Sequence, residues 1–197
     1  DIHIEAFSSN YELYGENTGR VMAVIRDMSP KCFRYSIDEA FAILEGFNSK
    51  QLRQWGEQLH DRIMQSVGMP VSIGIAPTKT MAKMASHFAK KHTGYNHVCI
   101  IDNEEQRIKA EMLYPISEVW GIGRKYATRL EGYGINTAYD FANHSHSWVH
   151  ATFKTIVIER IWTELHGIDC IPDDIPAKKK SICTSRSFDS MVNDFDA

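Results

Sequence analysis

The chain has 197 residues, of which 43% are hydrophobic and 24% charged, and its formal net charge is −3 at pH 7. This composition is typical of globular proteins with one large or two small domains, and the net charge alone does not indicate a nucleic-acid partner, so any such partner must be inferred from local clusters. The sequence contains no run of 18 apolar residues and no basic-then-apolar leader, so we expect no membrane contact and a cytoplasmic location.

The first half of the chain alternates predicted helices and strands. Apolar spacing, aromatic and β-branched runs and turn residues predict, in chain order, a helix at 10–28, one or two strands at 32–44, a helix at 52–67, a strand at 71–76, a helix at 78–91 and a strand at 97–101. Asn48 and Gln51 form a predicted capping box before the second helix. This order predicts an α/β (α+β) unit whose helices cover one face of a mixed or antiparallel sheet.

The second half of the chain lacks strand patterns until its last residues. Residues 103–168 are predicted to form a small all-α domain of short helices separated by glycines. A linker with two prolines and a charge run follows at 169–180, and 181–188 resembles the first strand of another domain. Because the chain lacks an initiating Met and stops after that strand, we expect it to be a fragment of a longer protein. The cysteines are far apart, which predicts reduced thiols and no zinc site: Cys32, Cys99, Cys170 and Cys183.

Two adjacent acids, Asp38 and Glu39, stand in the strand-like stretch RYSIDEAF (34–41) between apolar Ile37 and Ala40. Because neighbouring side chains of a strand point to opposite faces, at least one carboxylate should meet the core or a site, unless the strand bends there. Burial of a charge is unfavourable without a positive partner, and Mg²⁺, which binds one or two carboxylates together with phosphates, is such a partner. The pattern therefore indicates a Mg²⁺ site or, alternatively, an edge strand with solvated acids.

The predicted helix TKTMAKMASHFAKK (78–91) separates cationic from apolar residues. At about 100° per residue, one stripe falls within about 80° of arc and contains Lys79, Lys83, His87 and Lys90. The opposite side carries Met81, Met84, Ala85 and Phe88. Thr78 is a plausible N-cap, and a helix start favours anions. Beside a strand with acids, this helix could hold metal and triphosphate for phosphoryl transfer, although a solvated lysine face is the simpler interpretation.

A glycine-rich turn in VWGIGRKYATRLEGYGI (119–135) is the third constellation. Its residues Gly121, Ile122 and Gly123 precede the cations Arg124 and Lys125. Backbone N–H groups at such a turn can hold a nucleic-acid phosphate without reading the bases, as in a helix-hairpin-helix. The alternative is an ordinary glycine turn in a helical domain.

Two further clusters give no clear functional signal. Lys178–Lys180 could follow a phosphate backbone or simply keep the linker soluble. The stretch HSHSWVH (144–150) has three histidines but no acidic or Cys partner that would indicate a metal site, so we expect these histidines to be exposed.

The order of these motifs is more specific than any one of them. YSIDEAF (35–41), VSIGIAPTKTMAKMASHFAKK (71–91) and VWGIGRKYATRL (119–130) together resemble the Y-family translesion DNA polymerases. FSSNYELY (7–14) and SICTSRSF (181–188) resemble the UmuC type, the catalytic subunit of bacterial DNA polymerase V, and its plasmid-borne relatives. The resemblance covers nearly the whole chain and implies an error-prone polymerase that copies damaged DNA during SOS mutagenesis and repair.

The resemblance also implies a domain plan and roles for particular residues. It divides the chain into the end of the fingers (1–17), a palm (18–102), a thumb (103–168), and a linker with the first strand of a little finger (169–197). Asp38 and Glu39 correspond to Mg²⁺ ligands, and Lys90 corresponds to a contact with the incoming triphosphate, with Lys79 and Lys83 in the same basic pattern. The thumb turn Gly121–Gly123 would hold the DNA backbone.

The chain departs from the family pattern at its start. The family's first metal-binding Asp and its steric-gate aromatic precede the region matched here, so we expect the isolated chain not to polymerise DNA. The implied partners are primer–template DNA and dNTP, together with a UmuD′ dimer, the RecA filament and the sliding clamp. Two alternatives remain: a nucleotidyl cyclase, against which the GIGRK turn argues, and a non-catalytic DNA-binding or interaction module.

Overall fold

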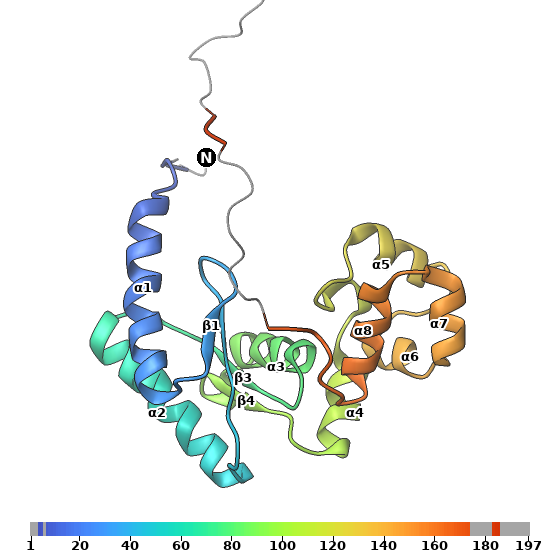
Figure 1. Ribbon diagram of the computed structural model, residues 1–197, viewed down its shortest axis with the longest axis horizontal. Coiled ribbons are helices and arrows are strands. Elements are labelled where there is room, and N and C mark those ends of the chain that lie inside the picture. Colours follow the sequence, from blue (N-terminus) through green and yellow to red (C-terminus); the bar gives the residue numbers. More distant parts are fainter. Residues whose placement is uncertain (1–3, 6, 174–182, 186–197) are drawn as a thin grey trace, which may run out of the picture.

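The computed structural model describes residues 4–5, 7–173 and 183–185 (Figure 1). Its helices and strands, in chain order, are α1 (Tyr11–Met28), β1 (Cys32–Arg34), β2 (Ala40–Ala42), α2 (Ser49–Val67), β3 (Ile73–Ile75), α3 (Lys79–Lys91), the 3₁₀ turn η1 (Thr93–Tyr95), β4 (Val98–Ile100), α4 (Glu104–Leu113), the 3₁₀ turn η2 (Ile116–Glu118), α5 (Arg124–Glu131), α6 (Ala138–Ala142), α7 (His146–Phe153) and α8 (Ile156–Leu165). Lys178–Lys180 and most of the predicted strand 181–188 lie outside the described residues. None of the described helices is long and apolar enough to cross a membrane.

Helices α1 and α2 pack together, and each begins at a capping asparagine, of which the sequence predicts the one before α2. The Asn10 side chain accepts a hydrogen bond from the Leu13 N–H at the start of α1. Asn48 and Gln51 form the predicted capping box of α2, which ends at Gly68 in the left-handed conformation with φ 72°. The inward faces of the two helices form one core cluster, made of Met22, Ile25, Trp55, Leu59 and Ile63.

Strands β3 and β4 are parallel neighbours joined by α3, which is the usual crossover connection. The expectation that helices cover one face of the sheet is wrong for this pair. A Cβ placed on Gly56 of α2 would meet Val98, whereas a Cβ on Gly74 of β3 would meet the backbone of α3. Because side chains alternate along a strand, α2 and α3 cover opposite faces, as is typical of parallel strands.

Strands β1 and β2 form a separate antiparallel hairpin, in which Phe33 pairs with Phe41. The described residues therefore contain two two-stranded sheets, one antiparallel and one parallel, where a single sheet was expected. The acids are also not within a strand, because Asp38 and Glu39 belong to the bend that joins β1 to β2. The five residues between the strands are needed to reverse the chain, and the strands stop after three residues each.

The second half of the chain is helical, as predicted, from α4 to α8, and these helices gather beside α3 (Figure 1). Buried residues of α3, including Met81 and Phe88, share one core cluster with residues of α8 such as Ile158 and Leu165. The core is thus continuous from α3 into the helical half. The domain boundaries at 102/103 and 168/169 remain predictions.

Candidate functional site

The bend that carries the two acids is closed by its own backbone. The N–H groups of Tyr35 and Ser36 both donate to the Glu39 carbonyl, at 2.9 and 3.1 Å. The Ser36 hydroxyl donates to Asp38 Oδ1 at 2.6 Å, and the Thr18 hydroxyl of α1 donates to the Ile37 carbonyl. Both acids are exposed at the end of the hairpin. The bend therefore presents two carboxylates to solvent from a hydrogen-bonded frame.

Lys83 brings the lysine helix to this bend. Its Nζ lies 2.5 Å from Glu39 Oε1, and the side chains of Lys83 and Glu39 are 25% and 43% exposed. The same ammonium lies 5.4 Å from the centre of the Tyr35 ring and 5.8 Å from that of Trp120. Acids and lysine helix are therefore neighbours in space, as the sequence pattern required, and the pair lets each side chain neutralise the other.

Trp120 joins the glycine turn to the acidic hairpin. Its Nε1–H donates to the Tyr35 hydroxyl at 3.0 Å, and its ring lies 5.9 Å from that of Phe41. These aromatic rings border an open pocket of about 250 Å³. The pocket is lined by Phe33, Tyr35, Phe41, Lys79, Trp120, Ile171 and Pro172. The acids, the lysine helix and the glycine turn thus meet around one aromatic cluster.

The glycine turn lies at the start of α5 and leaves that helix start without a side-chain cap. Gly121 has φ 86°, which favours glycine, and Gly123 is the N-cap of α5 without a side-chain hydrogen bond to the helix start. Ile122 is 4% exposed and anchors the turn in the core, whereas its neighbours, including Arg124 and Lys125, are exposed. Uncapped N–H groups beside two cations suit an anion. That this turn is a helix-hairpin-helix remains a prediction.

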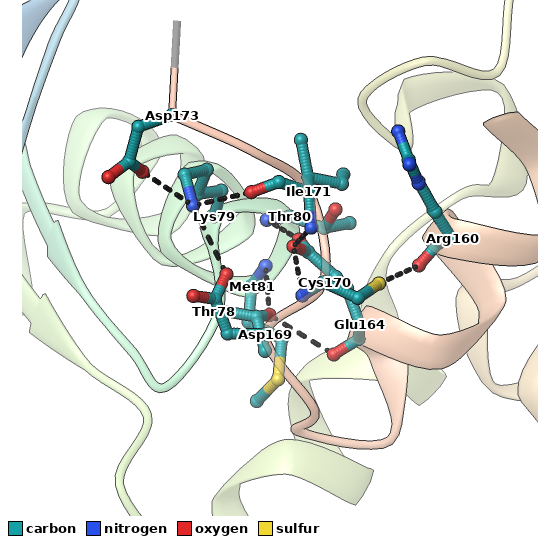
Figure 2. Close-up of polar contacts among 10 residues, drawn as sticks. All are labelled: Thr78, Lys79, Thr80, Met81, Arg160, Glu164, Asp169, Cys170, Ile171 and Asp173. Carbon is teal, nitrogen blue, oxygen red and sulfur yellow. Dashed lines mark hydrogen bonds and ion pairs between the residues drawn. The ribbon is translucent and has the colours of Figure 1, made fainter.

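The remaining cations of α3 have unequal surroundings. Lys79 Nζ contacts Asp169 Oδ1 at 3.1 Å, Asp173 Oδ1 at 3.0 Å and the Ile171 carbonyl at 2.8 Å (Figure 2). Burial acts to lower the pKa of Lys79, but the hydrogen bonds and charges of Asp173 and Asp169 outweigh it and raise the pKa above its usual value. Lys90, in contrast, is exposed and forms no ion pair among the described residues.

The start of α3 already holds a carboxylate from the chain itself. Thr78 is the N-cap, as predicted. The N–H of Thr80 donates to Glu164 Oε2 at 2.8 Å, and the Thr78 hydroxyl donates to the Glu164 carbonyl at 3.1 Å. Glu164 is fully buried. An anion does lie at this helix start, but it is a side chain of α8.

Several of these residues were missed by reasoning from sequence. Tyr35 and Trp120 lie inside the motifs, yet nothing in a linear pattern shows that they touch. Glu164 had a usable signal, because it falls three residues after buried Ile161 on the apolar side of α8. An acid on a buried helical stripe indicates a partner to be found.

In the histidine stretch 144–150, His146 and His150 are exposed, as expected, and His144 is partly buried. His150 Nδ1 lies 3.0 Å from Glu159 Oε1 and His146 Nε2 lies 3.5 Å from Glu159 Oε2, so the acid that the stretch itself lacks comes from α8. Within the described residues, however, no group of three or more His, Cys, Asp or Glu side chains could hold a metal ion. All four cysteines are free thiols.

Comparison with known proteins finds a matching family model and several similar sequences. Residues 2–87 match the impB/mucB/samB family. Protein UmuC of Salmonella typhimurium is 37% identical over 197 residues, which are 98% of this chain and 46% of UmuC. The chain is thus similar to the UmuC-type proteins over almost all of its own length. A DNA polymerase IV from Dehalococcoides mccartyi is 30% identical over 185 residues, covering 92% of this chain and 45% of that protein. The resemblance seen in the motifs is therefore confirmed.

Solved structures agree on the fold. An insertion ternary complex of Dbh DNA polymerase matches 80% of this chain and 45% of that chain, with a TM-score of 0.66 and 21% identity. At this identity the likeness establishes the fold alone, a mixed α+β arrangement with helices over small sheets. The chain spans about half the length of the curated relatives it matches.

Proposed function

We propose that this chain is part of an error-prone translesion DNA polymerase and carries two of its catalytic acids. The observation that carries the proposal is the contact between Lys83 and Glu39, which sets a lysine-lined helix against an exposed pair of carboxylates. The similarity to UmuC and to a DNA polymerase IV supports the same activity. On this proposal residues 18–102 are the palm, and 103–168 are the thumb.

Asp38 and Glu39 would hold Mg²⁺ together with the phosphates of the incoming nucleotide. The two carboxylates are exposed and adjacent, and they match the number of ligands that a protein usually supplies to Mg²⁺. Mg²⁺ binds one or two carboxylates, and phosphate oxygens and water fill its other coordination positions. When bound, the metal would polarise the reacting phosphoryl group and neutralise its charge. The described residues offer no third acid at this place.

The lysines of α3 divide into those that are available to a triphosphate and those that are not. Lys90 is exposed and unpaired among the described residues, and Lys83 has one exposed carboxylate partner. An exposed ion pair contributes only about 0–1 kcal/mol, so a triphosphate could take the place of Glu39 at Lys83. We therefore assign the triphosphate contact to Lys90 and Lys83. Lys79 belongs to the predicted set but is already paired twice.

The turn Gly121–Gly123, with Arg124 and Lys125, would hold the DNA backbone. Backbone N–H groups and cations contact phosphates without reading base identity, and this suits an enzyme that must accept damaged template. Because Trp120 joins the turn to Tyr35 of the acidic hairpin, DNA held here would be kept at a fixed position relative to the acids. The UmuD′ dimer, RecA filament, sliding clamp and cytoplasmic location remain predictions from relatedness.

The test is template-directed dNTP incorporation by the full product of the gene that encodes this chain. Asp38→Asn and Glu39→Gln should each lower the rate at least about 100-fold, because each removes a negative charge that would hold the metal against the triphosphate. Glu45→Gln is the matched control, since Glu45 is an exposed acid after the same hairpin, paired with Lys31 at 2.9 Å. Wild-type rates in both acid variants would refute the assignment.

Binding of a primer–template duplex distinguishes the polymerase from a DNA-binding module. Arg124→Ala and Lys125→Ala should each weaken binding equally for different sequences, and each should make the salt slope shallower by about one, because each removes a cation that neutralises a phosphate. Lys50→Ala, at an exposed position of α2, should change neither quantity. If DNA binding depends on the turn but synthesis never depends on Asp38 or Glu39, the non-catalytic alternative is correct.

A further inference from the structure

The chain leaves α8 through a short segment, residues 169–173, which we name the exit segment. Glu164 holds it from one side: Glu164 Oε1 accepts from the N–H of Cys170 at 3.4 Å and from that of Ile171 at 3.1 Å. The other oxygen of the same carboxylate accepts from Thr80 at the start of α3. One fully buried carboxylate therefore joins the end of α8, the start of α3 and the exit segment (Figure 2).

Lys79 holds the exit segment from the other side. Its ammonium contacts two carboxylates, of Asp169 and Asp173, and the carbonyl of Ile171 that lies between them. An ammonium has three protons to donate, and each of these three acceptors lies within hydrogen-bond distance. The Lys79 side chain is only 12% exposed. Figure 2 shows the three contacts converging on this one nitrogen.

We propose that Lys79 is a positioning residue that, together with Glu164, anchors the exit segment to the start of α3, and that it does not bind the incoming nucleotide. The anchoring role stands on these contacts alone. The exclusion from nucleotide binding rests on the proposed function.

The hydrogen-bond partners of Lys79 support the second part of the proposal, that Lys79 does not bind the incoming nucleotide. A triphosphate at Lys79 would have to displace two carboxylates and a carbonyl from a mostly buried ammonium, whereas at Lys83 it would displace one exposed carboxylate. Two negative charges of the exit segment would also repel the phosphates nearby. Among the three predicted lysines, Lys79 is thus the one whose donors are fully used within the chain.

The anchor has a consequence for the aromatic pocket. Ile171 and Pro172 line that pocket together with Lys79 and Trp120. Fixing the exit segment on α3 therefore also fixes one wall of the space beside the glycine turn.

Amide hydrogen exchange on this chain tests the anchor directly. Lys79→Met should raise the exchange rates of the Cys170 and Ile171 amides at least about tenfold, because the ammonium no longer holds the segment. Asp169→Asn combined with Asp173→Asn should produce the same increase, and Lys79→Arg should restore protection. Lys83→Met is the matched control and should leave both amides unchanged. Unchanged exchange in Lys79→Met would overturn the anchor.

Steady-state kinetics of the full gene product test whether Lys79 binds the incoming nucleotide. Lys79→Met and the double Asp variant should leave the KM for dNTP within about twofold of wild type, while Lys90→Met should raise it. A tenfold rise in KM for Lys79→Met, with no rise in the double Asp variant, would show that Lys79 binds nucleotide and overturn the proposal. If no variant or wild type incorporates dNTP, the proposed function fails, and the exchange experiment still decides the anchor.

Discussion

Gly74 of β3 is the position at which the packing of the lysine helix is most sensitive to a small change. A Cβ built on Gly74 would lie 2.1 Å from the Ala82 carbonyl oxygen and 2.2 Å from the Ser86 nitrogen, both in the backbone of α3. Ordinary contacts of a Cβ begin at 3.4 Å, so Gly74→Ala requires a separation of 3.4 minus 2.1, or 1.3 Å. Backbone atoms of a helix cannot rotate aside, so α3 and β3 must move apart.

We expect Gly74→Ala to lower the free energy of unfolding by about 3 kcal/mol, the upper end of the usual cost of overpacking, because both obstacles are main-chain atoms. Urea denaturation followed by far-UV circular dichroism measures this as a lower midpoint at constant slope. The matched control is Gly19→Ala in α1, where a Cβ meets nothing within 4 Å. There alanine should stabilise the chain by about 0.5–1 kcal/mol, since glycine disfavours helix.

A loss below about 1 kcal/mol in Gly74→Ala would refute the claim that α3 sits directly on the β3 backbone. The position also matters for the site, because Ala82 and Ser86 flank Lys83. A displaced helix would carry Lys83 away from Glu39. In a variant that still folds, the KM for dNTP of the full gene product should therefore rise together with the loss of stability.

Two further predictions concern groups that join the helices and loops around the site. Burial raises the pKa of Glu111 to about 7, and Arg107 opposes this only in part, so the folded state holds the proton more tightly than the unfolded state does. As pH rises from 4.5 to 7, wild type should therefore lose up to about 3 kcal/mol of unfolding free energy relative to Glu111→Gln. A difference between the two proteins that does not change with pH in urea denaturation would contradict this. Trp120→Phe removes the hydrogen bond to Tyr35 but keeps an aromatic ring, so it should lower the free energy of unfolding by about 1 kcal/mol. It should also weaken primer–template binding less than Trp120→Ala does. Equal binding by both variants would show that the ring does not position the turn.

Local signals in the sequence predicted most elements because each depends on neighbouring residues. The capping box of Asn48 and Gln51 and the N-cap Thr78 were found from their spacing alone. The apolar stripe of α3, which includes Met84 and Ala85, is buried as its period predicted. Such features need no knowledge of the rest of the chain, since a capping residue bonds an N–H group only three residues further along.

Features that depend on distant partners could not be predicted in the same way. The contact of Thr80 with Glu164 spans 84 residues, and nothing near either residue identifies the other. The sequence left open whether the acids lie within one strand or at a bend in it, because the β-branched and aromatic residues around the bend at 35–39 favour strands on both sides. Gly74 lies in the predicted strand 71–76, and its missing side chain, which lets α3 cover the second face of the parallel pair, has no signal in the residues beside it.

The charged groups around the site differ in how readily they can change partners, and this difference separates ligand-binding residues from structural ones. The pair of Lys83 and Glu39 is partly exposed and weak, so it can open when phosphates and a metal arrive. The carboxylate of Glu164 is fully buried and accepts three backbone N–H groups, so removing its partners would leave an uncompensated charge. Lys79, with three acceptors and little exposure, resembles Glu164 more than Lys83. Three lysines of similar sequence context on one helix can therefore serve different purposes. The number and burial of their partners decide which purpose each lysine serves, and the sequence pattern does not contain that information.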